Sequence, residues 1–594
     1  MSAKKTINNF KSTIKDLLAR DLLDHIFVSM NFEPIQKSPK YLSWIDAKLI
    51  VFVNDYVFKH KLLDSAFVKT MNKAFSTTRF EILLKRFLVE YLLQLFAKLY
   101  DFSCGKNVLY QNIVLEDNPL NRFAVTEYSR EFSVSLNVKW SSPQNSFLKL
   151  IRMALLVKSV VVISLKNGLK FSGRIENYKV MRESIWGLDD SGEKLFCDDF
   201  LVDGDKIRKQ DIIFFSRGPH TDDGRQKAYR DAQKYGYAHF DLCKLSLTLK
   251  AFVTRVISKY IILGSKALLC DLNGSNFSLF SSIFSYFANF GLPYEKVFSN
   301  YKIGAELGHS YFSPYHIVES IICQSFGAKY YLMHWSDMSI NINNHIVAFL
   351  GCDKYLVWGD AHIKGVEGGS ELFCHTGYVF KRFILEIKSR RNKILSDANV
   401  DVKGKVISFF DESFGGEVKM VEEHFVNFWE MALKLALKEK DNTIIIKPKE
   451  LSRYLKLSDH QMKHFLEIKT QLELLPNSHI ITQWSFIEGI GVSDIVVTQG
   501  MASSATIAII CGIDGFYLDQ VDYDHPFSKL FKDKIVFDDS DKLINMIQEV
   551  IKGGASPLKD ISPELLRRYD HYGDDRGIDL FRTILSGENN IRGS

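Results

Sequence analysis

The chain lacks the marks of a membrane-spanning, secreted or disulfide-stabilised protein. No stretch reaches the ~18 uninterrupted apolar residues that a bilayer-spanning helix needs. The lysine-rich first residues are not followed by the apolar core of a secretory signal. None of the eight cysteines stands in a CxxC pair, which in a chain of 594 residues disfavours a disulfide scaffold or a zinc site. We therefore expect a cytoplasmic protein, or one held at the cytoplasmic face of the inner membrane.

Several motifs with known chemistry are also missing. The chain has no GxGxxG, no phosphate-binding loop of ATPases and no GxSxG, which disfavours dinucleotide enzymes, ATPases and α/β hydrolases respectively. A net charge of only +6, not clustered, disfavours a nucleic-acid partner. His460 and His464 stand four apart without the glutamate of a zinc protease, so we expect them at the surface. From these absences we expect that the protein binds neither a metal ion nor a cofactor.

What is present is the composition of a large soluble globular protein with several cores. Apolar residues make up 46% and charged residues 25%, and 45 Phe with 25 Tyr form an aromatic excess. Apolar residues recur at helical spacing over 10–27 and 80–100. The first of these helices is basic and amphipathic, which fits contact with an anionic membrane and fits equally a core helix with solvated lysines.

The chain beyond the N-terminal helices divides into three regions. Residues 106–204 carry β-rich runs at 132–138 and 157–165 and predict a small α+β lead-in. From 205, continuous apolar runs of the kind found in buried parallel strands alternate with helix-length segments. In the first series the strands are expected at 211–215, 260–263, 329–333 and 354–358, with a helix at 314–326. After a polar linker, a second series predicts strands at 405–410, 443–447, 479–482, 494–498, 515–519 and 534–537, and helices at 418–438, 458–475, 503–511 and 540–552.

This alternation predicts an α/β fold of two Rossmann-like domains facing a cleft, behind a helical and α+β N-terminal region. The expected parts are a helical region at 1–105, the lead-in at 106–204, a first Rossmann-like domain with linker at 205–400, and a second such domain with a C-terminal helix at 401–594.

The most informative segment runs from Glu488 to Ala508. A buried strand leads into small residues, and a helix begins near Ser503. Unpaired N–H groups and the dipole of a helix start favour a phosphate, and Ser503, Ser504 and Thr506 add hydroxyl donors. An ordinary strand–turn–helix connection with a serine cap explains the pattern as well.

The run Ser493-Asp494-Ile-Val-Val-Thr498, followed by Gly500, Ser503, Ser504 and Ala508, resembles the C-terminal-domain motif of GT-B glycosyltransferases of bacterial surface-polysaccharide (capsule or O-antigen) synthesis. The similarity continues through 515–519, 534–539 and 569–576 and covers about 205–585. The resemblance implies that the loop with Gln499 and Gly500 holds the donor nucleotide, that the first domain takes the acceptor, and that no metal is needed. Epimerases and phosphotransferases of the teichoic-acid type share this architecture.

Three further residues of the second domain are donor-site candidates. Lys447 ends a strand where, in the enzymes that the chain resembles, a basic residue meets a donor phosphate; a solvated lysine before Pro448 is the alternative. Asp411 follows the first strand in a glycine-rich loop, where its carboxylate can bond sugar or ribose hydroxyls or cap a helix. The resemblance implies that Glu488 binds ribose hydroxyls. The alternative is an exposed loop residue without this role.

Candidate catalytic residues lie in the first domain. His334 and Asp337 follow a strand closely enough for the imidazole to act as general base beside a carboxylate, and an aspartate can instead be a covalent nucleophile. His309 opens another loop and is the next candidate. Each histidine can equally be a packed or surface residue.

The leading hypothesis is a glycosyltransferase that moves a sugar from a nucleotide-activated donor, such as CMP-activated Kdo, to a lipid-linked glycan acceptor at the inner leaflet. A second is a phosphotransferase that uses CDP-glycerol. A third is a non-catalytic subunit of a polysaccharide assembly complex that keeps the fold.

Overall fold

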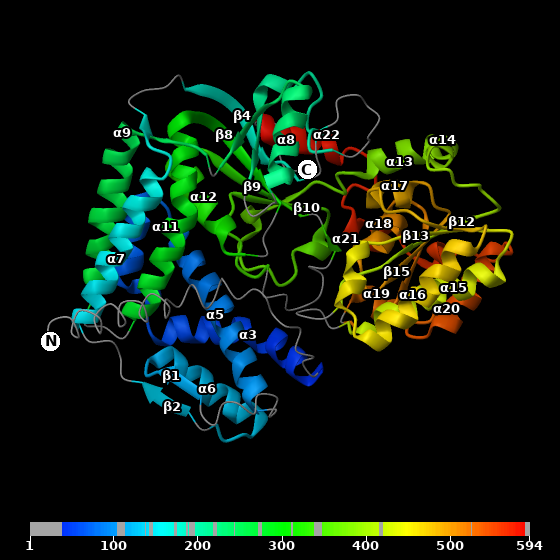
Figure 1. The fold of residues 1–594 in the computed structure, drawn as a ribbon, viewed down its shortest axis with the longest axis horizontal. Helices are drawn as coiled ribbons and strands as arrows, with labels where there is room; N and C mark the ends of the chain where they lie inside the picture. The colour runs from blue at the N-terminus through cyan, green and yellow to red at the C-terminus, as the bar shows by residue number, and fades with distance from the viewer. Residues whose placement is uncertain are drawn as a thin grey trace, which may run out of the picture.

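A computed structural model describes residues 39–587 except 104–112, 137, 142–145, 171–174, 186–187, 189–196, 218–221, 243, 271, 273–275, 310–312, 335, 338–346, 415–419 and 524. The helix expected at 10–27 lies outside the described residues. Two domains with parallel sheets follow a helical N-terminal region (Figure 1).

The second domain contains a six-stranded parallel sheet with the strand order of the Rossmann fold. Across the sheet the order is β14-β13-β12-β15-β16-β17, which is 3-2-1-4-5-6 counted along the chain. Every residue of the two central strands, β12 and β15, is buried, as in a sheet covered on both faces. The strands are β12 (Val406–Phe410), β13 (Thr443–Lys447), β14 (Ser478–Ile480), β15 (Ile495–Gln499), β16 (Asp514–Leu518) and β17 (Val536–Phe537).

Helices connect these strands, and each expected helix of this domain is found within a few residues of its predicted bounds. They are α15 (Glu422–Lys438), η7 (Leu451–Lys456), α16 (Asp459–Leu474), α17 (Phe486–Gly491), α18 (Ser503–Ile510), α19 (Pro526–Leu530) and α20 (Ser540–Ile551).

The first domain contains a seven-stranded parallel sheet whose strands follow the same order, with one more strand at the edge. From one edge the strands run β6-β5-β4-β8-β9-β10-β11, or 3-2-1-4-5-6-7 within the sheet. The strands are β4 (Glu176–Glu183), β5 (Ile212–Ser216), β6 (Ala238–Asp241), β8 (Tyr301–Gly308), β9 (Lys329–Met333), β10 (Lys354–Val357) and β11 (Phe373–His375). The predicted α/β fold with two Rossmann-like domains is thereby confirmed.

The start of the first domain differs from the prediction. The central strand β4 lies inside 106–204, so this sheet begins before residue 205 and the region is not a separate lead-in. The run at 260–263, expected as a strand, is the end of a π-helix, η3 (Phe252–Leu263), and 157–165 belongs to helix α7 (Ser146–Leu165). Both segments are rich in β-branched residues, but they pack against each other and against helices, and such contacts override strand propensity.

Residues 132–138 also differ from the expected strand. They span the end of helix α6 (Pro119–Phe132) and the first residue of β2 (Val138–Ser141), which pairs with β1 (Ile113–Glu116). The remaining elements of the first half are α8 (Asp222–Lys234), β3 (Leu169–Lys170), β7 (Leu247–Thr248), α9 (Leu249–Ala251), α10 (Gly264–Leu269), α11 (Phe277–Asn300), α12 (Tyr315–Ser325), α13 (Lys381–Ser389) and α14 (Arg391–Asp397).

The N-terminal helices share one core with the first domain. Helices α4 (Ala66–Phe75) and α5 (Phe80–Ser103) pack against α11 and α12, and α3 (Pro39–Lys59) packs against α5. Phe67 stacks on Phe280 with ring centroids 4.7 Å apart, and Phe75 meets Phe287 edge-on at 4.8 Å. Much of the aromatic excess therefore forms this core. Among the described residues, no helix combines the length and apolar character needed to cross a bilayer.

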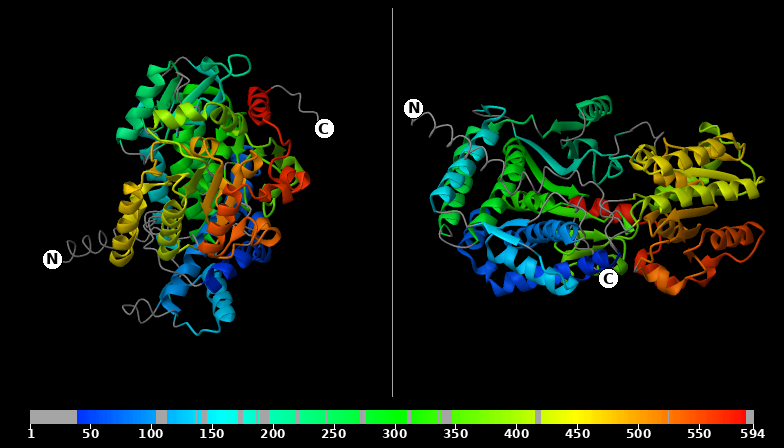
Figure 2. Two further views of the ribbon diagram at one scale, coloured as in Figure 1. Left: turned by 90° about the vertical axis from the view of Figure 1, so that its right-hand side faces the viewer. Right: turned by 60° about the horizontal axis from the view of Figure 1, so that its bottom comes forward.

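The C-terminal tail returns from the second domain to the first. Helix α21 (Pro563–Tyr569) lies beside the end of β10, and α22 (Gly577–Ser586) lies against the first domain in all views (Figure 2). Arg582 of α22 donates hydrogen bonds to the carbonyls of Phe200 (3.0 Å) and Leu201 (3.2 Å). The two domains are thus connected both by the linker helices and by this tail.

Gly515 of β16 lets helix α18 approach the second sheet closely, and its replacement should loosen this contact. A Cβ atom there would lie 2.6 Å from the carbonyl oxygen of Ala505. Gly515→Ala should therefore lower the free energy of unfolding by about 1–3 kcal/mol, because backbone must move. Urea unfolding followed by circular dichroism measures the change.

The control is Leu474→Ala, since Leu474 is 78% exposed. It should change stability by less than ~0.5 kcal/mol. Equal stability of Gly515→Ala and the parent chain would contradict the close packing of α18 on β16.

Candidate functional site

In the second domain the strand order reverses between β12 and β15, and open α/β sheets bind ligands beyond the carboxyl ends of such strands. Asp411 and Glu412 follow β12, while Gln499 ends β15 and Gly500 follows it. The backbone N–H of Glu412 donates to Gln499 Oε1 at 3.0 Å, which joins the two strand ends. Gly500 has φ of +60°, a left-handed conformation that favours glycine and turns the chain toward α18.

The Gln499 side chain is 1% exposed, and its amide Nε2 has no hydrogen-bond partner among the described residues. Its orientation is set by Glu412, because an N–H can donate only to the oxygen of the amide. A buried amide donor without a partner costs free energy. The group is therefore suited to an oxygen acceptor of a bound ligand.

Asp411 and the nearby lysines surround the same strand ends. Asp411 accepts hydrogen bonds from the backbone N–H of Lys449 (2.6 Å) and from Trp429 Nε1 (3.2 Å), and burial raises the pKa of its carboxyl to about 6. Burial lowers the pKa of Lys447, which donates to the carbonyl of Pro448 at 2.7 Å. The Lys449 ammonium is paired with Glu412.

Glu488 caps a helix. Its carboxylate accepts from the backbone N–H of Ser485 at 2.7 Å, and its own N–H donates to Ser485 Oγ at 3.3 Å, which closes a capping box at the start of α17. The carboxylate is near enough to Lys447 to influence its pKa. The capping box thus holds Glu488 beside the strand ends and gives it a structural role.

The start of helix α18 binds a side chain of the first domain. Ser503 Oγ accepts from the backbone N–H of Asp337 (3.1 Å) and lies 2.9 Å from Ser336 Oγ. Thr506 Oγ1 donates to a carboxylate oxygen of Asp337. Of the three hydroxyls predicted to hold a donor phosphate, one therefore binds the carboxylate of Asp337 and one accepts from its backbone N–H, while Ser504 is half-buried beside them.

Asp337 lies at the centre of a buried polar cluster, which we call the interdomain clasp: Asp337, His362, Ser503, Thr506 and His525. The carboxylate is 1% exposed, 3.3 Å from His362 Nε2 and 3.6 Å from His525 Nε2. Burial raises the pKa of Asp337, but the adjacent imidazoles of His362 and His525 outweigh it and hold the pKa below its ordinary value. His362 belongs to the first domain and His525 to the second, so the clasp joins the domains.

His334 lies next to the clasp. Its Nδ1 is 2.6 Å from Tyr355 Oη, and its ring is 4.3 Å from that of His362. Its side chain has no solvent exposure, and burial, with His362 nearby, lowers its pKa well below the ordinary value. His334 and Asp337 are thus brought together as the sequence suggests, in a position that is closed to an acceptor in this conformation.

His309 occupies a different place, at the switch point of the first domain. It follows β8, where the order of the first sheet reverses between β4 and β8. It lines a small pocket with Glu183, Arg217, Glu306 and Glu319. Burial, Arg182 and Arg217 lower the pKa of His309 well below its ordinary value, so its imidazole is neutral at pH 7.

The carboxylates of this pocket were not predicted from the sequence. Arg217 pairs with Glu319 and lies 3.4 Å from Glu183, while Tyr294 Oη donates to Glu306 at 3.1 Å. Burial raises the pKa of Glu306 well above its ordinary value, and the nearby Glu319 adds to the rise. Acidic residues in an otherwise apolar strand, as in β8, are the only sequence signal for such a group.

These features give the two switch points complementary chemistry. The second domain offers an amide donor, lysines and a carboxyl group that is protonated near pH 6, which suit an anionic ligand. The first domain offers carboxyl groups, an arginine and a neutral imidazole, which suit hydroxyl groups.

Asp337→Asn should weaken the clasp at neutral pH. The asparagine amide has one oxygen acceptor where the carboxylate has two. The variant should therefore lose about 1–3 kcal/mol of unfolding free energy at pH 7. Because the folded-state pKa of Asp337 is depressed, its stabilisation is present above the unfolded value and lost as pH falls below ~4. The stabilities of variant and parent, measured by urea unfolding, should therefore converge below pH 4.

The matched control is Asp397→Asn, an exposed aspartate at the end of α14. It should shift stability by less than ~0.5 kcal/mol at either pH. A constant difference between Asp337→Asn and the parent from pH 7 to pH 3 would contradict the ionised clasp.

Comparison with known proteins leaves the family open. No family model and no curated protein sequence matches the chain. Similar solved structures include the wall teichoic acid polymerase TagF soaked with CDPG (10% identity, 75% of this chain and 97% of that chain, TM-score 0.42) and Anabaena HepE in complex with UDP and glucose (10%, 68% and 99%, 0.36). Another is a putative UDP-N-acetylglucosamine 2-epimerase from Listeria monocytogenes (11%, 71% and 99%, 0.40). At such identities and scores these structures decide neither family nor function, and the architecture rests on the strand order of the chain itself.

Proposed function

We propose that the chain is a glycosyltransferase that moves a sugar from a nucleotide-activated donor to a growing bacterial surface polysaccharide. A CMP-activated acidic sugar such as Kdo is one candidate donor, and a lipid-linked glycan at the inner membrane is the acceptor that we favour. The observation that carries the proposal is the buried amide nitrogen of Gln499 at the switch point of the second domain, which has no hydrogen-bond partner within the described part of the chain.

The surroundings of Gln499 support a nucleotide phosphate or sugar oxygen as its acceptor. Asp411, with a pKa of about 6, adds little negative charge in mildly acidic solution, and Lys447 and Lys449 follow the neighbouring strand. The dinucleotide glycine motif is missing from the loop after β12, so a mononucleotide donor fits better than NAD or FAD.

The helix start at Ser503, Ser504 and Thr506 is the second part of the proposed donor site. A donor phosphate there would displace Asp337, because it would take the Thr506 hydroxyl that binds the carboxylate and the Ser503 hydroxyl that binds the backbone N–H of the same residue. The positive end of α18 would favour the phosphate as it favours the carboxylate. Donor binding would then loosen the clasp and open the space between the domains to the acceptor.

The proposed base is His309, with Glu183 and Arg217 placing the acceptor hydroxyl. A neutral imidazole can accept the proton of that hydroxyl as the bond to the sugar forms. His334 and Asp337, the first choices from sequence, we assign to structural roles, because Asp337 is buried in the contact between the domains and His334 is buried beside it in the first domain.

Gln499→Glu tests the donor site. The new carboxylate keeps an oxygen for the N–H of Glu412 but replaces the amide donor with an acceptor, so nucleotide affinity should fall by about 1–3 kcal/mol. Calorimetric titration with CMP, CDP, UDP, GDP and dTDP measures the affinity of the parent chain and of the variant.

Gln461→Glu is the matched control, since it adds the same charge on helix α16, outside the strand ends. Its nucleotide affinity should equal that of the parent. Nucleotide binding that is unchanged in Gln499→Glu would contradict the donor site, and turnover of CDP-glycerol without sugar transfer would replace the glycosyltransferase with a glycerophosphotransferase.

His309→Ala tests the proposed base. Loss of a general base should lower kcat by roughly 10²–10⁴-fold while nucleotide affinity stays near that of the parent. His334→Ala should instead lower the free energy of unfolding, because it removes the partner of Tyr355 in the buried contact. Transfer at the parent rate by His309→Ala would exclude it as the base.

A further inference from the structure

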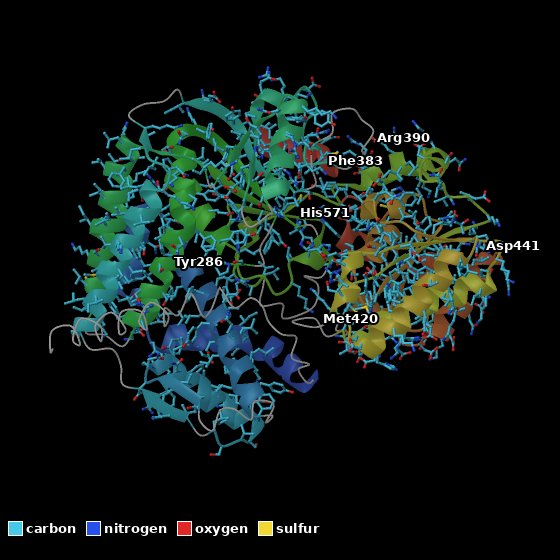
Figure 3. All side chains as sticks on the ribbon, in the orientation of Figure 1. Tyr286, Phe383, Arg390, Met420, Asp441 and His571 are labelled. Carbon is cyan, nitrogen blue, oxygen red and sulfur yellow. The ribbon has the colours of Figure 1, made fainter. Side chains whose placement is uncertain are left out.

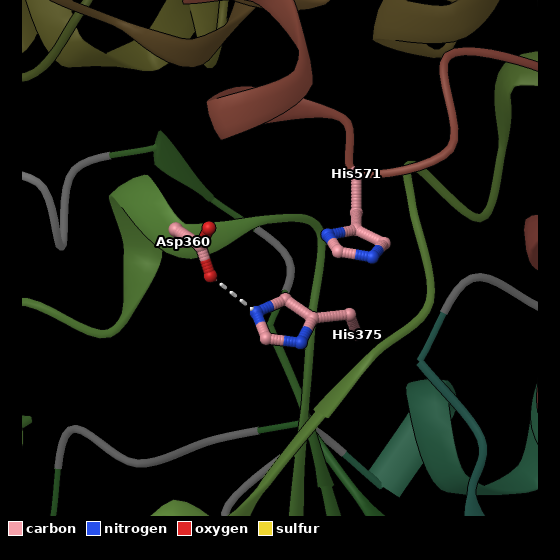
Figure 4. A group of neighbouring side chains, drawn as sticks. All are labelled: Asp360, His375 and His571. Atoms are coloured by element: carbon pink, nitrogen blue, oxygen red, sulfur yellow. Dashed lines mark ion pairs between the residues drawn. The ribbon is translucent and has the colours of Figure 1, made fainter. Parts of the chain in front are cut away.

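Two histidines and an aspartate from distant parts of the chain meet at the junction between the domains. Asp360 follows β10, His375 ends β11, and His571 lies in the tail after α21, at the junction (Figure 3). Asp360 Oδ1 is 2.7 Å from His375 Nε2, and the two imidazole rings stack with centroids 4.6 Å apart (Figure 4). One nitrogen or oxygen atom of each residue lies within 4.8 Å of the others.

The backbone holds these three residues firmly in place. Strands β10 and β11 pair in register, with Val357 opposite His375, and the N–H of His571 donates to the carbonyl of Trp358 at 2.9 Å. Asp570, the residue before His571, accepts from the N–H of Tyr378 (2.9 Å) and from Lys381 Nζ (2.8 Å). A site on such a scaffold is preorganised, while the side chains at its mouth can still turn.

We propose that Asp360, His375 and His571 bind a divalent transition-metal ion of the zinc class. Two imidazoles and one carboxylate are a ligand set that zinc uses where it keeps an open position. Ligand atoms around a tetrahedral zinc ion lie roughly 3.4 Å apart. Side-chain rotation therefore has to open the 2.7 Å contact between Asp360 and His375 and to bring His571 closer, within a spacing that does not exceed 4.8 Å now. Asp360 is 57% exposed and is free to make that rotation.

The open position of the ion would face a cavity of about 570 Å³. Its lining supplies both signs of charge and consists of Asp360, Glu564, Arg567, Arg568, His571 and Tyr572. The cavity gives the ion an entry path, which a buried group of ligands would lack. The two guanidinium groups in turn favour an anionic fourth ligand on the metal.

The metal site is independent of the proposed transferase function. It lies toward the β11 edge of the first sheet, whereas the switch point of that sheet is between β4 and β8. No sequence pattern indicates this site, because the three residues come from separate segments with no ligand spacing between them.

Zinc binding by the whole chain tests this proposal. After treatment with a chelator, the chain is titrated with ZnCl₂ in a calorimeter, and we expect one strong site per chain. His375→Ala and His571→Ala should each lower zinc affinity at least ~10-fold. His464→Ala, which removes an exposed histidine of α16, should leave the affinity unchanged.

Asp360→Asn provides a second measurement that keeps the shape of the site. Co²⁺ bound to the parent chain should give visible absorption bands whose intensity and position differ in Asp360→Asn, because a ligand oxygen has been changed. Absence of strong zinc binding, equal zinc affinity in the parent and both histidine variants, or identical Co²⁺ spectra would each overturn the proposal.

Discussion

The arrangement of the two domains depends on one buried carboxylate. Asp337 belongs to the first domain, and its side chain reaches the start of helix α18 in the second. There its carboxylate has no contact with bulk water. Removing a carboxylate from water is costly unless charged or hydrogen-bonding partners replace the water. Thr506 and His525 of one domain and His362 of the other supply them, so the partners are satisfied only when the domains stand together.

This constraint connects the fold to the proposed chemistry. The hydroxyl groups that hold Asp337 are those that a donor phosphate would use. Gln499 precedes this helix start, and its Nε2 has no partner among the residues that the structure describes. A donor could therefore meet Gln499 first and displace Asp337 afterwards. The carboxylate of Asp337 thus occupies the place at the start of α18 that the donor phosphate would take.

The second domain could be predicted almost completely from the sequence, whereas the centre of the first could not. Strands such as Val406–Phe410 are buried on both faces and therefore appear as continuous apolar runs. The central strands β4 and β8 carry Lys179, Lys302 and Glu306, because one end is exposed and the other lines the switch point. The run at 260–263 looked like a strand because it is apolar and β-branched, but helix packing decided its conformation.

The same physical reason separates the predicted from the unpredicted parts of the site. Asp411 and Gln499 were found because the ends of parallel strands can be located from the strands themselves. The contact between Asp337 and Thr506 joins residues far apart in the chain and depends on how the domains dock, which no local pattern encodes. The grouping of Glu183, Arg217, Glu306 and Glu319 likewise depends on the strand order of the first sheet.

A crystal structure of the chain with a bound nucleotide sugar tests the central claim most directly. The account predicts a donor oxygen within hydrogen-bonding distance of Gln499 Nε2, a phosphate at the start of α18, and Asp337 displaced from Thr506. A nucleotide bound elsewhere, with Gln499 still unpartnered and the clasp intact, would contradict it.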